Sequence, residues 1–177
     1  MTRVCLLGAE DVNLEYELLS HETSRNALAT YDLREPYDNS VALETVSLGA
    51  AVALLNDLNW YLVRFVEDVL VFEPSVSETE WLSRDAATAV RDDELAPGET
   101  DRFLKIYGVA EPETNTLDDR TGPDEETDAD GGGSQDRPPR LVEPMFVTRT
   151  GPDLPEYDLQ DVEKTLVVRV TESEFGA

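Results

Sequence analysis

The sequence holds only one cysteine, one histidine and two lysines among its 177 residues. The single cysteine, Cys5, permits no internal disulfide, and in the apolar run around it a free thiol behaves as a small hydrophobic side chain. One cysteine and one histidine cannot build a structural zinc site. The acidic stretch at residues 118–130 lacks the positional glycine and the spacing of a calcium-binding loop. We therefore predict neither a bound metal nor a cofactor.

Phosphate-binding and membrane-spanning patterns are lacking as well. No Gly-x-x-x-x-Gly-Lys sequence occurs, and Gly8 stands alone rather than in a Gly-x-Gly-x-x-Gly series. No charged leader followed by a long apolar stretch opens the chain, and no run of ~18 consecutive apolar residues occurs in it. An acidic surface would also repel phosphate backbones and anionic lipids. We expect a cytoplasmic protein that binds neither membranes nor, in general, nucleic acid.

Charge of one sign dominates the composition. The chain has 39 acidic and 14 basic residues, for a net charge of −25. Residues 111–139 hold ten acids and two arginines, so the other 148 residues still carry −17, and twelve of the basic residues are arginines. At ~1 M salt the Debye length falls to ~3 Å, which removes most of the self-repulsion. The pattern is typical of halophilic proteins from cells that accumulate molar salt.

The chain changes character at residues 111–139. This segment has four prolines and a Gly-Gly-Gly triplet, with Leu117 and Ala129 as its only apolar side chains. It cannot bury enough surface to offset its ordering entropy, so we predict a disordered acidic linker. Residues 1–110 are predicted to form an α+β domain. Residues 140–177 are too few for a core of their own, and we predict a β-hairpin that docks on the first domain.

The hydrophobic pattern predicts the α+β class, with an antiparallel sheet and packed helices. Residues 3–8 are typical of a buried strand, and residues 27–37 and 41–46 of an edge hairpin. The segment after residue 10 fits either a strand or a helix, and we favour the helix. Apolar residues at positions 48, 51, 52, 55 and 58 predict a core helix with Ser47 as its N-cap.

Later segments complete the predicted fold. Residues 60–66 and 69–72 are rich in β-forming side chains and predict a second hairpin. Residues 77–91 combine a capping-box pattern with an apolar stripe, and residues 99–107 place apolar side chains on one face, so each predicts a helix. If the segment after residue 10 is helical, the order of elements over residues 3–66 matches a ferredoxin-like βαββαβ unit.

Four residues remain as ligand-binding candidates, and none is assigned a catalytic role. His21 is the only histidine and could act as a general base, although its polar neighbours favour a surface position. Arg34 could hold an anion through its planar guanidinium group, or could form an ordinary ion pair within the charged stretch that begins at Asp32. Asp57 lies where the core helix meets the next segment, and helix termination also explains it.

Two segments carry a resemblance to a known family. Tyr-Asp-Leu-Arg-Glu-Pro-Tyr at 31–37 and Leu-Asn-Asp-Leu-Asn-Trp-Tyr at 55–61 resemble small haloarchaeal proteins of an uncharacterised family. The resemblance covers roughly residues 1–108. It implies no activity, ligand or functional residue.

Two classes of function remain open. The first is a non-enzymatic interaction or regulatory module with a protein partner, which the lack of any catalytic constellation favours. The alternative is a small enzyme or ligand-binding protein that uses carboxylates and Arg34, whose side chains would then converge in an apolar-lined cleft. Trp60 and Trp81 are expected to be packing residues rather than ligand platforms.

Overall fold

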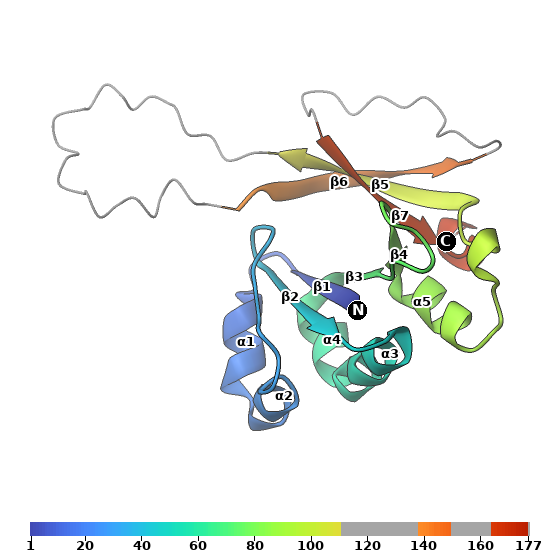
Figure 1. Cartoon of the computed structure of the whole chain (residues 1–177). Coiled ribbons are helices and arrows are strands. Elements are labelled where there is room, and N and C mark those ends of the chain that lie inside the picture. The colour runs from blue at the N-terminus through green and yellow to red at the C-terminus, as the bar shows by residue number, and fades with distance from the viewer. Residues whose placement is uncertain (111–137, 150–163, 177) are drawn as a thin grey trace, which may run out of the picture.

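The computed structural model describes residues 1–110, 138–149 and 164–176. Residues 111–137, which make up most of the predicted linker, lie outside the described residues, so the linker stays a prediction. The described residues form helices that pack against a mixed, mostly antiparallel sheet (Figure 1). The predicted α+β class is therefore confirmed.

The strands of the described residues form one seven-stranded sheet with the order β2-β1-β3-β4-β7-β5-β6. Neighbouring strands are antiparallel, except that β4 and β7 run parallel. The strands are β1 (Thr2–Gly8), β2 (Ser40–Thr45), β3 (Val66–Phe72), β4 (Trp81–Ser83), β5 (Phe103–Ala110), β6 (Arg140–Thr148) and β7 (Lys164–Val170). The short strand β4 thus joins the first three strands of the chain to the last three.

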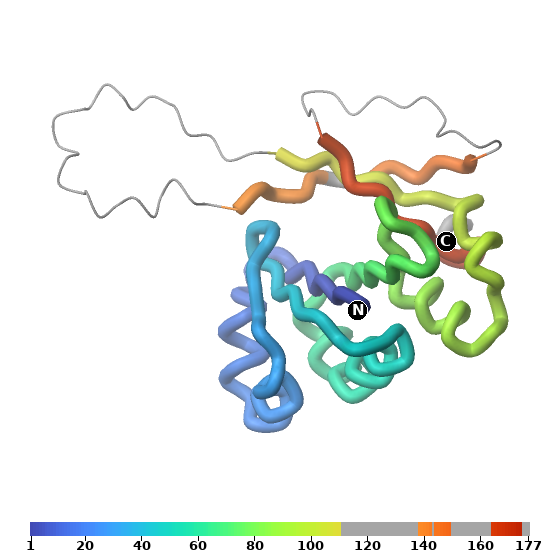
Figure 2. The backbone as a smooth tube through the Cα atoms, viewed as in Figure 1, coloured from blue at the N-terminus to red at the C-terminus, as the bar shows by residue number. Residues whose placement is uncertain are grey.

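Helices connect the strands of the first half of the sheet and lie below it in the view of Figure 2. They are α1 (Leu14–Ser20), α2 (Glu22–Ala27), α3 (Leu48–Asp57), α4 (Asn59–Phe65) and α5 (Arg84–Arg91). A 3₁₀ turn, η1 (Pro97–Glu99), precedes β5, and the short helix α8 (Glu172–Gly176) follows β7. The helical layer therefore covers one face of β1, β2 and β3.

β1 is buried on both faces, because alternate residues of a strand point to opposite sides of the sheet. Val4 and Leu6 pack with the helices in the larger hydrophobic cluster. Cys5 and Leu7 point the other way and pack in a second cluster with residues of β5 and β7, including Tyr107. The sheet therefore curls, so that its far half covers the second face of β1 and β3 (Figure 1).

Two of the predicted helices are confirmed, and each begins with a side-chain cap. The hydroxyl of Ser47 accepts a hydrogen bond from the N–H of Ala50 at 3.1 Å, and α3 begins at the next residue. The segment after residue 10 forms α1, and Asn13 Oδ1 accepts from the N–H of Tyr16 at 3.1 Å. Each side chain satisfies an N–H that would otherwise have no partner inside the helix.

The hairpin predicted for residues 60–72 is wrong, because most of its first strand is helix α4. Leu58, Tyr61 and Leu62 are buried at helical spacing, and Phe65 packs against the same cluster one turn later. This 3.6-residue period outweighed the β propensity of the individual side chains. The strand β3 then begins directly at Val66.

Of two further predicted helices, the one over residues 77–91 is found only over residues 84–91, and the one over residues 99–107 is mostly a strand. Residues 81–83 form β4, and helix α5 begins only after it, with the hydroxyl of Ser83 accepting from the N–H of Ala86 at 3.1 Å. Residues 103–107 belong to β5, which pairs with β6 on one side and β7 on the other. The partners of both segments lie far away in the sequence, so tertiary pairing overrode the local pattern.

The strand connections also differ from the prediction. Between β1 and β3 the chain forms two helices, one strand and two more helices, so the expected βαββαβ order is not found. Residues 27–37 contribute a single bridge, from Arg34 to Ala42, instead of a strand. The C-terminal strands β6 and β7 were expected to pair with each other, but they lie on opposite sides of β5. β6 and β7 each pair with β5 instead of with each other, as the predicted hairpin would require.

Candidate functional site

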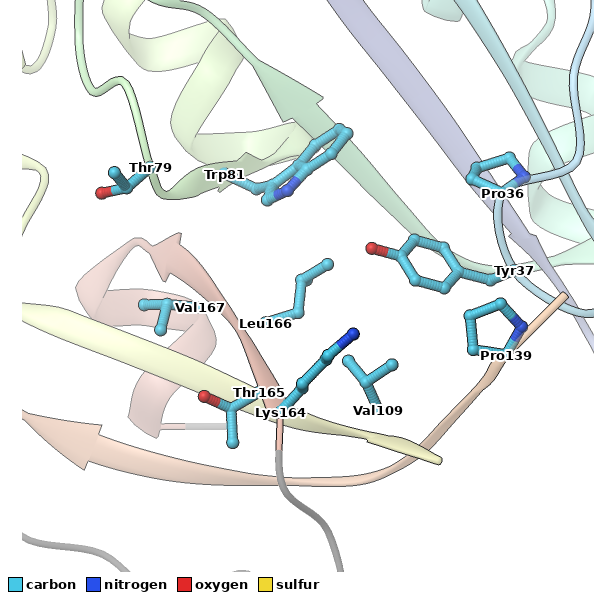
Figure 3. A pocket seen from close by; sticks show the side chains of 10 residues that line it. All are labelled: Pro36, Tyr37, Thr79, Trp81, Val109, Pro139, Lys164, Thr165, Leu166 and Val167. Atoms are coloured by element: carbon cyan, nitrogen blue, oxygen red, sulfur yellow. The ribbon is translucent and has the colours of Figure 1, made fainter. Parts of the chain in front are cut away.

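A cleft opens between the two halves of the curled sheet (Figure 3). The rings of Tyr37 and Trp81 and the side chain of Leu166 border it, and the amine of Lys164 points into it. Its volume is about 430 Å³, within the range of ~300–1,000 Å³ that small-molecule sites occupy. The cleft is therefore large enough to hold a small organic molecule.

The cleft exists because β4 is short. β4 pairs with β7 through Trp81 with Val168 and through Leu82 with Arg169. Residues 164–167 of β7 precede this pairing and line the cleft. The segment before β2 forms the opposite wall, where the N–H of Asp38 donates to the carbonyl of Pro139 at 2.8 Å.

The cleft lining differs in charge from the rest of the chain. None of the described residues that line it is acidic, although the chain has 39 acidic residues. Lys164 is the only cation among these described lining residues. Burial, and then the nearby Cys5, raises the pKa of Tyr37, so its hydroxyl stays protonated and can donate a hydrogen bond.

Cys5 packs in the same hydrophobic cluster as Tyr37 and has no exposed surface. Burial raises the pKa of its thiol to about 12, although a hydrogen bond with Ser40 acts in the opposite direction. A thiol with so little thiolate is a poor nucleophile. The expectation that Cys5 behaves as a small hydrophobic side chain is therefore confirmed.

A buried charge network ties the C-terminal strands to the segment before β4. Glu80 accepts hydrogen bonds from Arg149 Nη2 at 2.6 Å and from Arg169 Nε at 2.7 Å. All three side chains are about one-tenth exposed. Burial acts to raise the pKa of Glu80, but the hydrogen bonds and charges of the two arginines outweigh it and lower that pKa. The network has the form of a structural clamp, because its buried charges join residues of three separate segments.

Aromatic rings gather where α1, α2 and α4 meet. The ring centroid of His21 lies 6.1 Å from that of Trp60, 5.5 Å from Tyr61 and 5.9 Å from Phe65. Trp60 meets the other three rings edge to face, which is a favourable arrangement for aromatic pairs. The cluster is therefore held rigidly by its own contacts.

Part of this cluster faces solvent. Trp60 is 49% exposed and Val63, one helical turn further along α4, is 69% exposed. The guanidinium carbon of Arg64 lies 3.8 Å from the ring centroid of Trp60, which is a cation–π contact. The aromatic patch is defined by these side chains and their ring neighbours, namely His21, Trp60, Tyr61, Val63, Arg64 and Phe65.

The four candidate residues do not converge on the cleft. His21 belongs to the aromatic patch, and its Nε2 lies 3.6 Å from Glu17 Oε1. Asp32 and Arg34 lie together as an exposed ion pair with 3.3 Å between Oδ2 and Nη2. Asp57 is exposed at the end of α3. None of the four lines the cleft.

The sequence patterns did not predict which residues build the cleft and the aromatic patch. Trp60 was expected to be a packing residue, but helical spacing would have placed Leu58, Tyr61 and Leu62 inward and left Trp60 outward. Trp81 packs on the cluster around Cys5 and also lines the cleft. No local signal could have joined Trp81 to Lys164, because the two residues lie 83 positions apart in the sequence.

The described residues contain neither a metal-binding cluster nor a membrane-spanning helix. Nowhere among them do three or more His, Cys, Asp or Glu side chains gather in a way that could hold a metal ion. No helix in the described part of the chain is long and apolar enough to cross a membrane. The cleft and the aromatic patch therefore remain as the features on which a function can be built.

The fold and these features define a small α+β protein with one curled, mostly antiparallel sheet. The chain belongs to a family of unknown function, DUF5804, whose model matches residues 2–109. No curated protein and no solved structure matches the chain. The matched region contains the whole aromatic patch, whereas the cleft also uses Pro139 and the start of β7, which lie beyond the match.

Proposed function

We propose that this protein is a non-enzymatic interaction module that docks a protein partner through the aromatic patch. The exposed stack of Trp60 and Arg64, with Val63 beside it, carries the proposal. Trp and Arg are among the residue types that dominate binding energy at protein interfaces. Single exposed apolar residues are ordinary, but this ring is fixed against three others and presents a rigid surface that loses little entropy on binding.

Charge around the patch selects the kind of partner. Glu15 and Glu17 lie on α1, Glu22 begins α2, and Asp57 is three residues before Trp60. A second copy of this acidic chain would bring like charges onto that rim, and so would its own acidic residues 111–139. The partner is therefore a protein segment with an apolar anchor flanked by arginine or lysine.

The same proposal places the protein in the cytoplasm of a haloarchaeal, salt-accumulating cell. A net charge of −25 with twelve arginines and two lysines supports this setting. At ~1 M salt, charges separated by more than ~3 Å are largely screened. Burial of the Trp60 ring then supplies more of the affinity than any single carboxylate of the rim.

A displayed library of random short peptides, selected on the purified chain in molar KCl, tests the docking proposal. Enriched peptides should carry an aromatic or leucine anchor next to Arg or Lys, and Trp60→Ala should weaken their binding about tenfold or more. Val46→Ala is the matched control, because Val46 is 78% exposed and lies outside the patch. The proposal fails if such peptides are not enriched, or if the Trp60→Ala variant binds them as well as the wild type.

The enzyme alternative predicts a different response in the host cell. Under that alternative, single replacement of His21, Asp32, Arg34 or Asp57 makes one metabolite accumulate while partner recovery stays intact. Under the docking proposal, His21→Ala loosens the packing around Trp60 and lowers partner recovery. Replacement of Asp32 or Arg34, whose side chains pair with each other at the surface, leaves both readouts unchanged.

A further inference from the structure

His21 is the only histidine of the chain, and its ring belongs to the aromatic patch. We propose that protonation of His21 weakens the docking of a basic protein segment on this patch, so that the partner is held at neutral pH and released at lower pH. This inference rests on the docking proposal and adds a form of regulation to the same site. It is carried by the pairing of His21 with Glu17, by its ring contacts, and by the cation that already lies on Trp60.

The position of His21 links a carboxylate to the aromatic rings. Its Nε2 lies 3.6 Å from Oε1 of Glu17, one helical turn earlier in α1. Its ring centroid lies within 6.1 Å of those of Trp60, Tyr61 and Phe65. The side chain of His21 is 40% exposed, so it can exchange a proton with solvent while the core stays closed. A charge on His21 is therefore placed where it acts on both the rim and the rings of the patch.

Three helices bring charged or titratable groups to the junction at which His21 lies. These groups are Glu17 on α1, Glu22 and Arg25 on α2, and Tyr61 and Arg64 on α4. Histidine is the side chain whose charge ordinarily changes between about pH 5 and 8, whereas carboxylates, phenols and guanidinium groups ordinarily keep theirs in that range. A change of pH near neutrality therefore acts on the patch through its histidine.

Protonation of His21 changes the electrostatics of docking in two ways. The imidazolium pairs with Glu17, so that this carboxylate is less available to an arginine or lysine of the partner. It also places a second cation beside the ring of Trp60, which already carries the guanidinium group of Arg64. Both changes disfavour a basic segment, and both act at contact distances, where molar salt screens charges least.

Proton NMR and peptide binding, both on the full chain in molar KCl, test the proposal together. Because the chain has one histidine, a single C2–H signal reports the pH range over which His21 takes up a proton. The binding probe is a capped peptide from the selected library that carries an aromatic or leucine anchor beside arginine and has no histidine or acidic residue. Its affinity should be about twofold to fivefold lower at the acid end of that range, with the same midpoint as the C2–H signal.

Variants separate the charge of His21 from its packing, because each variant is compared with itself at the two ends of the pH range. His21→Gln and His21→Lys, whose charges do not change over this range, should both lose the pH dependence, and His21→Lys should bind the peptide more weakly. Glu17→Gln should reduce the pH dependence. Glu15→Gln, which removes a carboxylate from the same helix, should retain it.

The regulation and the docking can fail separately. The regulation is overturned, and docking stands, if peptide affinity stays constant while the C2–H signal titrates, or if His21→Gln keeps the pH dependence. If no selected peptide binds at any pH, docking itself is overturned, and the regulation fails with it.

Discussion

The hydroxyl of Tyr107 on β5 donates a hydrogen bond to Asp68 Oδ2 on β3 at 2.5 Å, although β4 and β7 separate these two strands in the sheet. The amine of Lys105 lies 2.5 Å from the same oxygen. Side chains of strands so far apart in the order can meet only because the sheet curls over itself. Burial and the charge of Asp68 raise the pKa of Tyr107 well above its ordinary value, so the phenol stays a donor.

Replacing Glu80 should cost much of the stability of the fold. Glu80→Gln removes the carboxylate that pairs with the buried side chains of Arg149 and Arg169, and Arg149 keeps the more distant Asp101, whose Oδ2 lies 3.8 Å from its Nη1. Breaking a buried pair in this way costs about 3–5 kcal/mol. Urea unfolding at fixed molar KCl measures the loss. Asp32→Asn is the control, because its exposed pair with Arg34 should contribute less than about 1 kcal/mol. Equal losses in the two variants would contradict a structural role for the network.

Gly8 should not tolerate a side chain. A Cβ at this position would lie 2.5 Å from Asn39 Nδ2 and 2.9 Å from the backbone oxygen of Asn39. Asn39 cannot move easily, because its amide donates to Val12 and accepts from the N–H of Leu14. We expect Gly8→Ala to lower the free energy of unfolding by about 1–3 kcal/mol.

Gly98→Ala is the matched control for that substitution. A Cβ at Gly98 meets nothing within 4 Å, and the φ angle there is not positive. The substitution should leave stability unchanged or raise it by up to about 1 kcal/mol, because it restricts the unfolded chain. If Gly98→Ala is as harmful as Gly8→Ala, close packing against Asn39 is not the cause.

The thiol of Cys5 should resist alkylation in the folded protein. With no exposed surface and a pKa of about 12, it should react with iodoacetamide at pH 8 at least about 100-fold more slowly than in the urea-unfolded chain. Mass spectrometry of timed samples measures both rates. Similar rates in the two states would show that the cluster around Cys5 opens readily.

The raised pKa of Cys5 also predicts a loss of stability at alkaline pH. The folded state holds this proton more tightly than the unfolded state, so the contribution is fully present below the ordinary value of 9.0 and is lost as pH rises toward 12. The free energy of unfolding should therefore fall over that window. Tyr37 and Tyr107 act in the same direction, so Cys5→Val should reduce the slope without abolishing it.

Salt should stabilise the fold strongly. The 148 residues outside 111–139 carry −17, and their repulsion weakens as added salt shortens the Debye length. We expect the thermal midpoint to rise steeply from low to molar KCl, as followed by circular dichroism. A midpoint that does not depend on salt would contradict the proposed salt-rich setting.

Removal of residues 140–177 should destabilise the remaining chain. The deletion takes away β6 and β7, which are both neighbours of β5, and uncovers the face of the sheet that carries Cys5 and Leu70. Leu166, Val168 and Val170 are buried in that contact, and each large buried side chain contributes ~1.5–3 kcal/mol. An unchanged melting curve would show that the first 110 residues form an independent unit.

The local hydrophobic pattern was sufficient to predict two elements correctly. The strand at β1 and the helix at α3 follow from apolar spacing and from the cap at Ser47, and both are confirmed. The pattern was misleading around Trp60, where residues with high β propensity form helix α4. It was also misleading around Phe103, where apolar residues at helical spacing form strand β5. In these cases the sequence window contained signals for both structures.

The sequence by itself determined the α+β class, the inert character of the single buried cysteine and the acidity of the whole chain, because these depend on composition and on periods of a few residues. Only the tertiary structure decided that β5 lies between two strands from the C-terminal part, that Asp68 meets Tyr107, and that a cleft remains beside the short strand β4. The physical reason is that strand order is chosen by hydrogen bonds and packing between segments far apart in the chain, which no local period records.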